Sequence, residues 1–194
     1  MKAREGWVTV LDFETTGSVR GWAEEPWQIG VVEVREGRVT GRMEDSWLRV
    51  AEGRPFNRYA PGRWAEVRGE LAGADTLGSG WGRWREWLSP PRWIAAHHAA
   101  TEKGVLSRAA PMHRAAGWID TLALARAALP GLGEWHLERV AEATGAAERA
   151  RALVPGRTWH DALFDAAATA FFLEWLLEQE GWNEMELEAL ENVR

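Results

Sequence analysis

Two carboxylates close a β-prone stretch near the start of the chain, at a spacing that suits metal-dependent chemistry. The stretch Trp7–Gly17 contains them as Asp12 and Glu14. Residues i and i+2 of a strand point to the same side, so these two side chains would project together. Two like charges held side by side are costly without a cation. The stretch therefore fits either a carboxylate metal site at a strand end or a solvated turn.

Small residues follow these carboxylates directly. Thr15, Thr16 and Gly17 combine two short hydroxyl side chains with a glycine, which lets a ligand approach the backbone closely. A substrate groove beside the carboxylates is the corresponding functional hypothesis.

Three later patches carry the same kinds of side chain. They are the segment His97–Glu102, the pair Asp120-Thr121 and the segment His160–Ala166. In the last of these, Asp165 lies in an otherwise apolar helical stretch, where a carboxylate is costly unless it binds a cation or is hydrogen-bonded. Asp161 lies one helical turn earlier. A helix cap at Asp161 and a hydrogen-bonded core acid at Asp165 would explain this patch equally well.

Hydrophobic periodicity supplies the elements that would position these groups. The first expected strand begins at Trp7 and ends where Asp12 and Glu14 appear. The others are Trp27–Arg35, Arg38–Val50, Arg92–Ala96 and Trp118–Thr121, and Glu36-Gly37 predicts a hairpin between the second and third. The expected helices are Trp81–Leu88, Thr101–Arg108 with Thr101 as cap, Leu122–Leu129, Trp135–Thr144, Asp161–Gln179 and Glu184–Asn192 with Asn183 as cap. Residues 51–80 predict an irregular functional loop with one short helix.

A hairpin followed by alternating strands and helices predicts a mixed sheet with helices on both faces. We expect one α/β domain over residues 1–194, with a core at about 7–179 and an acidic C-terminal segment at 183–194. Residues 173–194 hold seven glutamates and one arginine, which accounts for the net charge of −6. The rest of the chain is neutral, so nucleic-acid binding is not excluded by charge.

Composition excludes several other classes. The chain has no cysteine, so disulfides and thiolate chemistry are excluded. No apolar run is long enough to span a bilayer, and the N-terminus leads straight into the first strand without room for a signal peptide. A cytoplasmic protein with no membrane partner is the expectation.

Two of the motifs resemble those of the DEDDh 3′–5′ exonucleases, the family of the DNA polymerase III epsilon proofreading subunit, ribonuclease T and oligoribonuclease. Asp12-Phe13-Glu14-Thr15-Thr16-Gly17 resembles the first motif, and the segment His160–Ala166 resembles the third, His-x₄-Asp followed by Ala. Residues 26–32 are similar to the second strand of the same group. The resemblance extends from about Val8 to Leu173 and implies a ribonuclease H-like, mixed five-stranded sheet.

The second motif departs from the family pattern His-Asn-Ala-x-Phe-Asp. Here His98 replaces the Asn, Thr101 replaces the Phe and Glu102 replaces the Asp. Glutamate adds one methylene, roughly 1.5 Å of reach, and Mg²⁺ demands near-ideal octahedral geometry. In the family this acid serves the second metal partly through water, which tolerates a longer side chain. Retained but retuned activity and impaired activity are both open.

The resemblance implies a metal site with two divalent ions, Mg²⁺ or Mn²⁺. Asp12 would bridge the ions, Glu14 and Asp165 would complete the shell of the first, and Glu102 would serve the second. His160 would be the general base that takes the proton of the attacking water, because the ordinary pKa of imidazole, about 6.5, suits that role.

The resemblance also implies the substrate contacts. Glu14 with Thr15, Thr16 and Gly17 would receive the terminal 3′-hydroxyl, and the product would be a 5′-mononucleotide. His98 either contacts substrate or packs against the protein.

The leading function is thus a metal-dependent 3′–5′ exonuclease that acts on single-stranded DNA or RNA 3′ ends. The alternatives are a catalytically weakened relative that binds nucleic acid or associates with a polymerase, and a globular protein whose acids are only structural. The choice between DNA and RNA, a homodimer and a polymerase partner all stay open.

Overall fold

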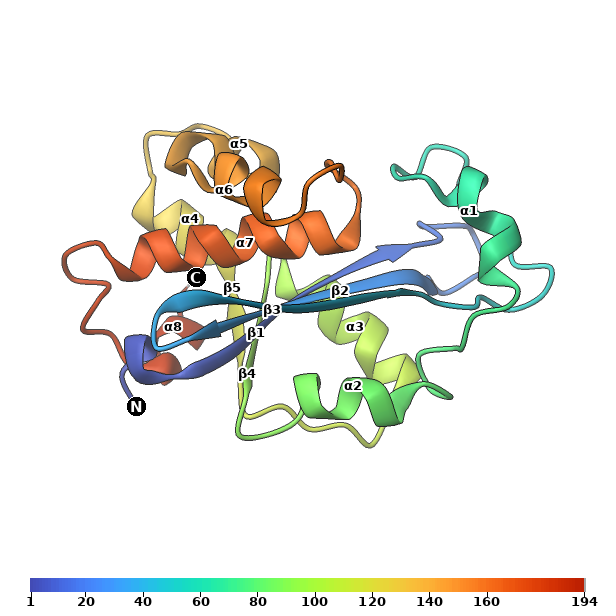
Figure 1. Ribbon diagram of the computed structural model, residues 1–194, viewed down its shortest axis with the longest axis horizontal. Coiled ribbons are helices and arrows are strands. Elements are labelled where there is room, and N and C mark those ends of the chain that lie inside the picture. Colours follow the sequence, from blue (N-terminus) through green and yellow to red (C-terminus); the bar gives the residue numbers. More distant parts are fainter. Residues whose placement is uncertain (194) are drawn as a thin grey trace.

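The computed structural model describes residues 1–193, and a mixed five-stranded sheet forms its centre (Figure 1). The strands are β1 (Trp7–Thr15), β2 (Pro26–Arg35), β3 (Arg38–Trp47), β4 (Trp93–Ala96) and β5 (Trp118–Asp120), in the spatial order β3-β2-β1-β4-β5. β1 runs antiparallel to β2 and parallel to β4. The predicted fold class, a mixed α/β sheet covered on both faces, is confirmed.

The alternation of side chains along β1 divides the core into two layers. Val8 and Val10 face the layer that contains α7 (Ala162–Leu177), while Leu11 and Phe13 face the layer that contains α2 (Trp81–Leu88) and α3 (Ala99–Ala109). Figure 1 shows α7 on one side of the sheet and α2 and α3 on the other. Asp12 and Glu14 continue the series of Val8 and Val10, so the strand's period of two directs them toward α7.

Helix α7 is the most deeply buried helix, and three shorter helices pack around it. These are α4 (Thr121–Ala128), α5 (Leu137–Thr144) and α6 (Ala146–Leu153), which lie above α7 in Figure 1. The sequence analysis did not predict α6. Gly145, at a left-handed φ of 76°, is both the C-cap of α5 and the N-cap of α6. From the sequence the glycine was interpreted only as the end of a helix.

The predicted starts of α3 and α5 are wrong. Helix α3 begins at Ala99, so Thr101 lies within its first turn and does not cap it. The turn is made instead by His98 at φ 73°, whose backbone N–H donates to Asp120 Oδ1 at 3.1 Å. Helix α5 begins at Leu137, and the His136 side chain caps it by accepting from the Arg139 backbone N–H.

The C-terminal segment packs against the N-terminus, which begins with a short 3₁₀ helix at Ala3–Glu5. Helix α8 (Leu187–Glu191) is shorter than predicted, and Glu186 holds the cap position that was predicted for Asn183. Before the helix, the chain pairs with the N-terminus through a Lys2–Glu186 β-bridge, which removes those residues from the helix. Arg194, the last residue of the predicted acidic segment, lies outside the described residues.

The long connection after β3 contains one helix, α1 (Trp64–Leu71), and its first part covers the end of β1. Asn57 makes the contact. Its backbone N–H donates to the Thr16 carbonyl at 2.8 Å, and its side-chain amide donates to the Ser18 carbonyl at 3.1 Å. Within residues 1–193, none of the helices combines the length and apolar character needed to cross a membrane.

Candidate active site

The difference in length between β1 and β4 opens a space beside the first motif. β4 pairs with β1 over Val8–Val10, whereas β1 continues to Thr15. The edge of β1 at Asp12–Glu14 is therefore not covered by β4, and α3 begins immediately after β4 with Glu102 in its first turn. This places acidic residues of β1 and α3 next to each other at one end of the sheet.

The start of α7 is fixed to β2 by close backbone packing and by one buried side chain. A Cβ at Gly30 would lie 2.4 Å from the backbone of Ala162 and Leu163, so β2 accepts the helix there because residue 30 is glycine. Gln28, which is fully buried, donates to Asp161 Oδ2 at 3.1 Å and accepts from the Ala162 backbone N–H at 3.2 Å. These contacts determine where the third motif lies relative to β1.

Asp161 and Arg157 hold the turn that carries His160. Asp161 accepts from the backbone N–H groups of Leu163 and Phe164, which makes it the predicted helix cap. Arg157 Nη1 lies 3.0 Å from Asp161 and 2.8 Å from Asp45. The turn also places His160 at a left-handed φ of 62°, a conformation that is uncommon for a residue with a side chain.

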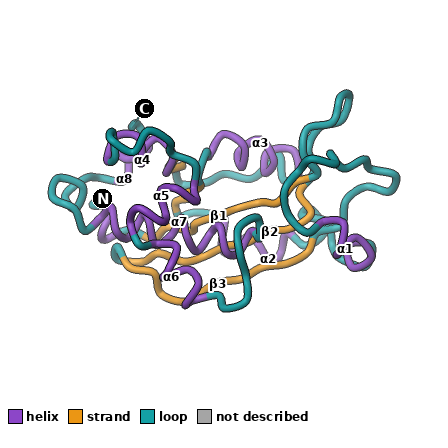
Figure 2. The backbone as a smooth tube through the Cα atoms, turned by 90° about the horizontal axis from the view of Figure 1, so that it is seen from above, coloured by secondary structure: helices purple, strands orange, loops and turns teal. Residues whose placement is uncertain are grey.

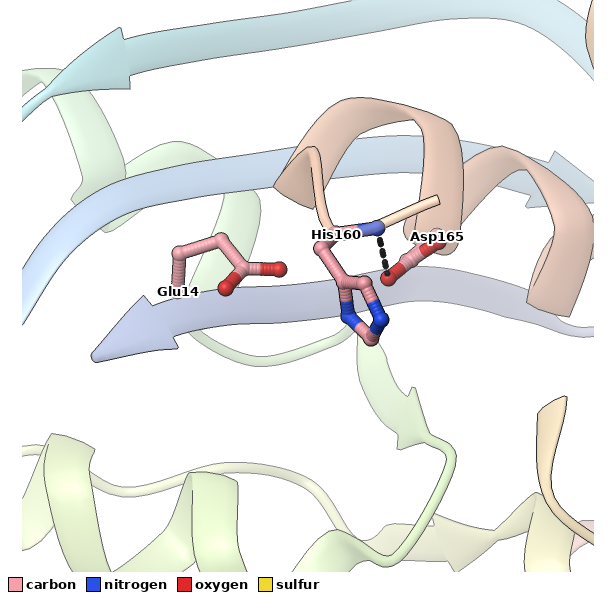
Figure 3. A group of neighbouring side chains, drawn as sticks. All are labelled: Glu14, His160 and Asp165. Atoms are coloured by element: carbon pink, nitrogen blue, oxygen red, sulfur yellow. Dashed lines mark hydrogen bonds between the residues drawn. The ribbon is translucent and has the colours of Figure 1, made fainter. Parts of the chain in front are cut away.

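Glu14, His160 and Asp165 converge in this space (Figure 3). One potential ligand atom from each side chain lies within 4.8 Å of the others. The His160 backbone N–H donates to Asp165 Oδ2 at 3.2 Å, so the same turn orients both residues. Glu14 and Asp165 are buried, whereas His160 is exposed and its ring remains accessible from the solvent.

Burial and mutual repulsion raise the pKa of the four predicted ligands. Burial, followed by repulsion from Asp165, raises the pKa of Glu14 to about 8. Burial, followed by repulsion from Glu14, raises the pKa of Glu102 to about 8. Burial raises the pKa of Asp165 to about 7, against a hydrogen bond from the His160 backbone, and raises the pKa of Asp12 well above its usual range. Each carboxylate is therefore disfavoured in its charged form unless a cation is present.

Unpartnered oxygens indicate where such a cation fits. Glu102 Oε2 and Asp165 Oδ1 are buried and have no hydrogen-bond partner within residues 1–193. A buried carboxylate oxygen without a donor is costly, and a divalent cation would supply the missing interaction. The nearby Arg157 pairs with Asp45 and Asp161 instead. The donor set is composed of carboxylate oxygens, which suits Mg²⁺ or Mn²⁺.

The two histidines of the second motif have different surroundings. The His97 ring lies 3.2 Å from Thr121 Oγ1 and 2.8 Å from the Trp135 carbonyl, so the ring connects the end of β4 to the segments after β5. Burial lowers the pKa of His97. His98 is exposed, and its Nδ1 lies 3.0 Å from Thr101 Oγ1.

The predicted substrate loop lies beside the carboxylates and is held from the other side. Thr16 is buried, whereas Thr15 and Gly17 are half-buried. A Cβ at Gly17 would lie 3.0 Å from Asn57, and its φ of 69° is a left-handed value that favours glycine. Thr15 and Gly17 are thus partly accessible to a ligand within a fixed loop, whereas Thr16 is not.

The sequence analysis did not identify four residues that shape this site. Gln28 and Asn57 make the contacts described above, and Gly62 lies so close to Glu14 that a Cβ there would be 3.2 Å from Glu14 Oε2. Glu24 adds another carboxylate near Glu102 and raises its pKa. Gln28 had a detectable signal, because a glutamine inside an apolar strand needs a buried partner. The other three depend on loop contacts that carry no periodic signal.

Comparison with known proteins gives structural matches without sequence matches. No protein-family model matches the chain, and no curated protein sequence matches it. Among solved structures, exonuclease X in complex with 5′-overhanging duplex DNA matches with a TM-score of 0.73 and 22% identity, over 96% of this chain and 98% of that one. The nuclease domain of 3′hExo, a DEDDh family member bound to rAMP, matches with a TM-score of 0.67 and 14% identity, over 95% and 98% of the two chains. This chain has the DEDDh exonuclease fold.

Larger nucleases share the fold over part of their length. The zinc-bound complex of E. coli exonuclease I with single-stranded DNA matches with a TM-score of 0.66 and 16% identity, over 91% of this chain. The match covers 41% of the exonuclease I chain, so this chain spans less than half of that protein.

Proposed function

We propose that the chain is a metal-dependent 3′–5′ exonuclease that releases 5′-mononucleotides from the 3′ ends of single-stranded DNA or RNA. The observation that carries the proposal is the convergence of Glu14, His160 and Asp165, with an unpartnered buried oxygen on Asp165, in a DEDDh exonuclease fold. Solved neighbours with this fold are complexed with DNA or with rAMP.

Asp12, Glu14, Asp165 and Glu102 would hold two Mg²⁺ or Mn²⁺ ions. Bound divalent ions supply an activated water and stabilise charge on the phosphate and the leaving oxygen. Glu14 and Asp165 hold their positions because β1 and α7 pack against each other, so these two carboxylates need little reorganisation when cations bind.

His160 would take the proton of the attacking water. His160 is exposed, and one ring nitrogen lies within 4.8 Å of carboxylate oxygens of Glu14 and Asp165. The hydrogen bond from the His160 backbone N–H to Asp165 holds the backbone from which the His160 side chain projects. Glu14 and the backbone of Thr15–Gly17 would receive the terminal 3′-hydroxyl, and His98 would lie at the rim on the α3 side.

A labelled oligonucleotide tests the proposal directly. We expect a single-stranded oligonucleotide labelled at its 5′ end to be shortened from the 3′ end in Mg²⁺ or Mn²⁺, and EDTA to abolish the reaction. The His160→Ala substitution should reduce the rate by about 10²–10⁴-fold, the range for loss of a general base. Parallel DNA and RNA substrates would show the sugar preference.

His136→Asn is the matched control. His136 is exposed and caps α5, and asparagine preserves the capping acceptor while it removes an imidazole. Its rate should equal that of the unchanged protein. Binding without shortening would contradict exonuclease activity and support a catalytically weakened relative that binds nucleic acid. If the protein neither bound nor shortened the oligonucleotide, the acids would have only a structural role.

A further inference from the structure

Helix α3 connects the proposed site to a basic part of the surface. It begins beside the site, where Glu102 is buried, and its 11 residues extend about 16 Å to Ala109. Residues 103–117 contain Lys103, Arg108 and Arg114 and no Asp or Glu. All three side chains are exposed, as is Arg85 on the neighbouring α2.

These four cations differ from several other arginines on and near the sheet. Arg42, Arg83 and Arg92, for example, form ion pairs with glutamates of β2, β3 or α2. Within residues 1–193, none of the four forms an ion pair with an acidic side chain. Arg108 donates instead to the Glu24 carbonyl, and Arg114 donates to the His113 carbonyl. Their charge is therefore not neutralised within the described chain.

Hollows surround the end of α3 and adjoin the same residues. One of about 640 Å³ is lined by Trp81, Arg85, Met112 and Arg114, among others. A second, of about 280 Å³, lies along Lys103, Arg114 and Trp118. A third, of about 260 Å³, lies between Arg108 and residues 23–26, which follow the predicted substrate loop. The third hollow contains Glu24 and Glu25 as well as Arg108, so the connection to the site is made by α3 itself, which carries Glu102.

We propose that Lys103, Arg108, Arg114 and Arg85, with these hollows, form an extended binding surface for the single strand on the 5′ side of the scissile nucleotide. We call it the α3 surface. The inference rests on the proposed function and adds the path of the substrate. Unpaired cations attract the phosphate backbone irrespective of sequence. Trp81 and Trp118 are partly exposed beside them, with His113 in a T-shaped contact with Trp81 and Lys103 over the Trp118 ring.

The face around α4, α5 and α6 provides a contrast within the molecule. Its exposed residues include Arg126, Arg139 and Arg151, which also lack acidic partners among residues 1–193, but Glu138, Glu142 and Glu148 lie among them on α5 and α6. Basic and acidic groups alternate there, so no continuous positive track results.

The test compares two triple variants in a His160→Ala background, where the oligonucleotide should be consumed about 10²–10⁴-fold more slowly. One carries Arg85→Gln, Arg108→Gln and Arg114→Gln on the α3 surface. The matched control carries Arg126→Gln, Arg139→Gln and Arg151→Gln and changes the net charge equally. The probes are a trinucleotide and a single strand of about 15 nucleotides, both labelled at the 5′ end, and binding is followed by fluorescence anisotropy over a range of salt concentrations.

We expect the α3-surface variant to bind the long strand at least about tenfold more weakly, with the slope of log K against log salt reduced by about 2, since each lost phosphate contact contributes about 0.7. Its affinity for the trinucleotide should be unchanged, and so should the affinities of the control variant for both probes. Equal losses for both probes, equal losses in both variants, or no loss would overturn the proposal. If the proposed exonuclease activity were wrong, this would appear separately, because the unmodified protein would not shorten the oligonucleotide.

Discussion

The two sides of the carboxylate cluster are built very differently. On the α7 side, Gln28, Arg157 and Asp161 form a connected set of hydrogen bonds, and the helix backbone touches Gly30 directly. On the α3 side, Glu102 lies near enough to Glu14 for the two carboxyls to repel each other, and it belongs to the first turn of a helix whose start depends on the turn at His98.

This difference indicates which side of the site tolerates amino-acid substitutions. Asp165 is held by a helix that cannot shift without disturbing β2, so a substitution there cannot be compensated by movement. Glu102 lies on an element with fewer fixed contacts, and its side chain has more rotatable bonds than that of an aspartate. We infer that the departure from the family motif occurs at Glu102 because α3 can absorb the longer side chain. The predictions below test this asymmetry.

The largest effect is expected for Asp165→Asn. The amide keeps the size and can still accept from the His160 backbone, but it removes the charge that a divalent ion needs. We expect the rate of 3′ shortening to fall by about 10³-fold, comparable to the loss of a major electrostatic group. Mn²⁺ affinity, measured by calorimetry, should fall in parallel. Asp75→Asn, an exposed acid on the connection after α1, is the control, and a loss below tenfold at Asp165 would exclude it as a ligand.

Gly30→Ala should have the second largest effect, because it displaces the start of α7 without changing any of the proposed ligands. The added Cβ would lie 2.4 Å from the α7 backbone, so the start of the helix must move. Overpacking of this kind costs about 1–3 kcal/mol of unfolding free energy, and a displacement of about 1 Å at a catalytic group can reduce the rate by about 10²-fold. Denaturant unfolding and kcat measure the two effects.

The matched control is Gly82→Ala on the exposed side of α2, where a Cβ meets nothing within 4 Å. That substitution should leave kcat unchanged and stabilise the protein by about 0.4–1 kcal/mol. If Gly30→Ala lowered stability without lowering kcat, the contact would matter for folding and not for placing His160 and Asp165.

Glu102→Asp should have a smaller effect than either. The shorter side chain withdraws the carboxylate by roughly 1.5 Å, and α3 can move to restore part of the contact. We expect a change in rate of less than about tenfold, larger with Mg²⁺ than with Mn²⁺ because Mg²⁺ is stricter about geometry. Rates in the two metals at matched concentrations provide the measurement. A loss as large as that of Asp165→Asn would contradict the proposed asymmetry.

The same asymmetry explains how much the sequence could predict. The motifs on β1 and at the start of α7 lie in long apolar segments, and the acid-bearing ends were recognised because carboxylates interrupt these segments. Helix α2 was predicted with its observed bounds because Trp84, Trp87 and Leu88 mark one buried stripe. Patterns of this kind depend on burial, which local sequence records well.

The errors lie where long-range contacts decide the conformation. The start of α3 depends on a hydrogen bond from His98 to Asp120, which are separated by more than 20 residues. The start of α8 depends on pairing with the N-terminus. The contribution of Asn57 comes from a loop with no periodicity, so its contact with the substrate loop could be found only in the structure.

The smallest expected effect is a pH dependence of stability in the metal-free protein. The pKa of Glu14 and of Glu102 is raised from the ordinary 4.5 to about 8 in the folded chain. Between those values the folded state binds more protons than the unfolded state, so the free energy of unfolding must fall as pH rises. This contribution is complete below about pH 4.5 and is lost as pH passes through about 8.

Thermal unfolding in EDTA should therefore show Tm falling by several degrees or more between about pH 5 and pH 9, since each 1 kcal/mol lost corresponds to roughly 2–4 °C for a chain of this size. Saturating Mg²⁺ should reverse the trend, because the ionised carboxylates that destabilise the metal-free chain are the ones that bind the cation. Asp165→Asn removes one of the repelling charges and should flatten the EDTA curve. A Tm that rises with pH in EDTA, or one that Mg²⁺ leaves unchanged, would show that these acids do not form a cation site.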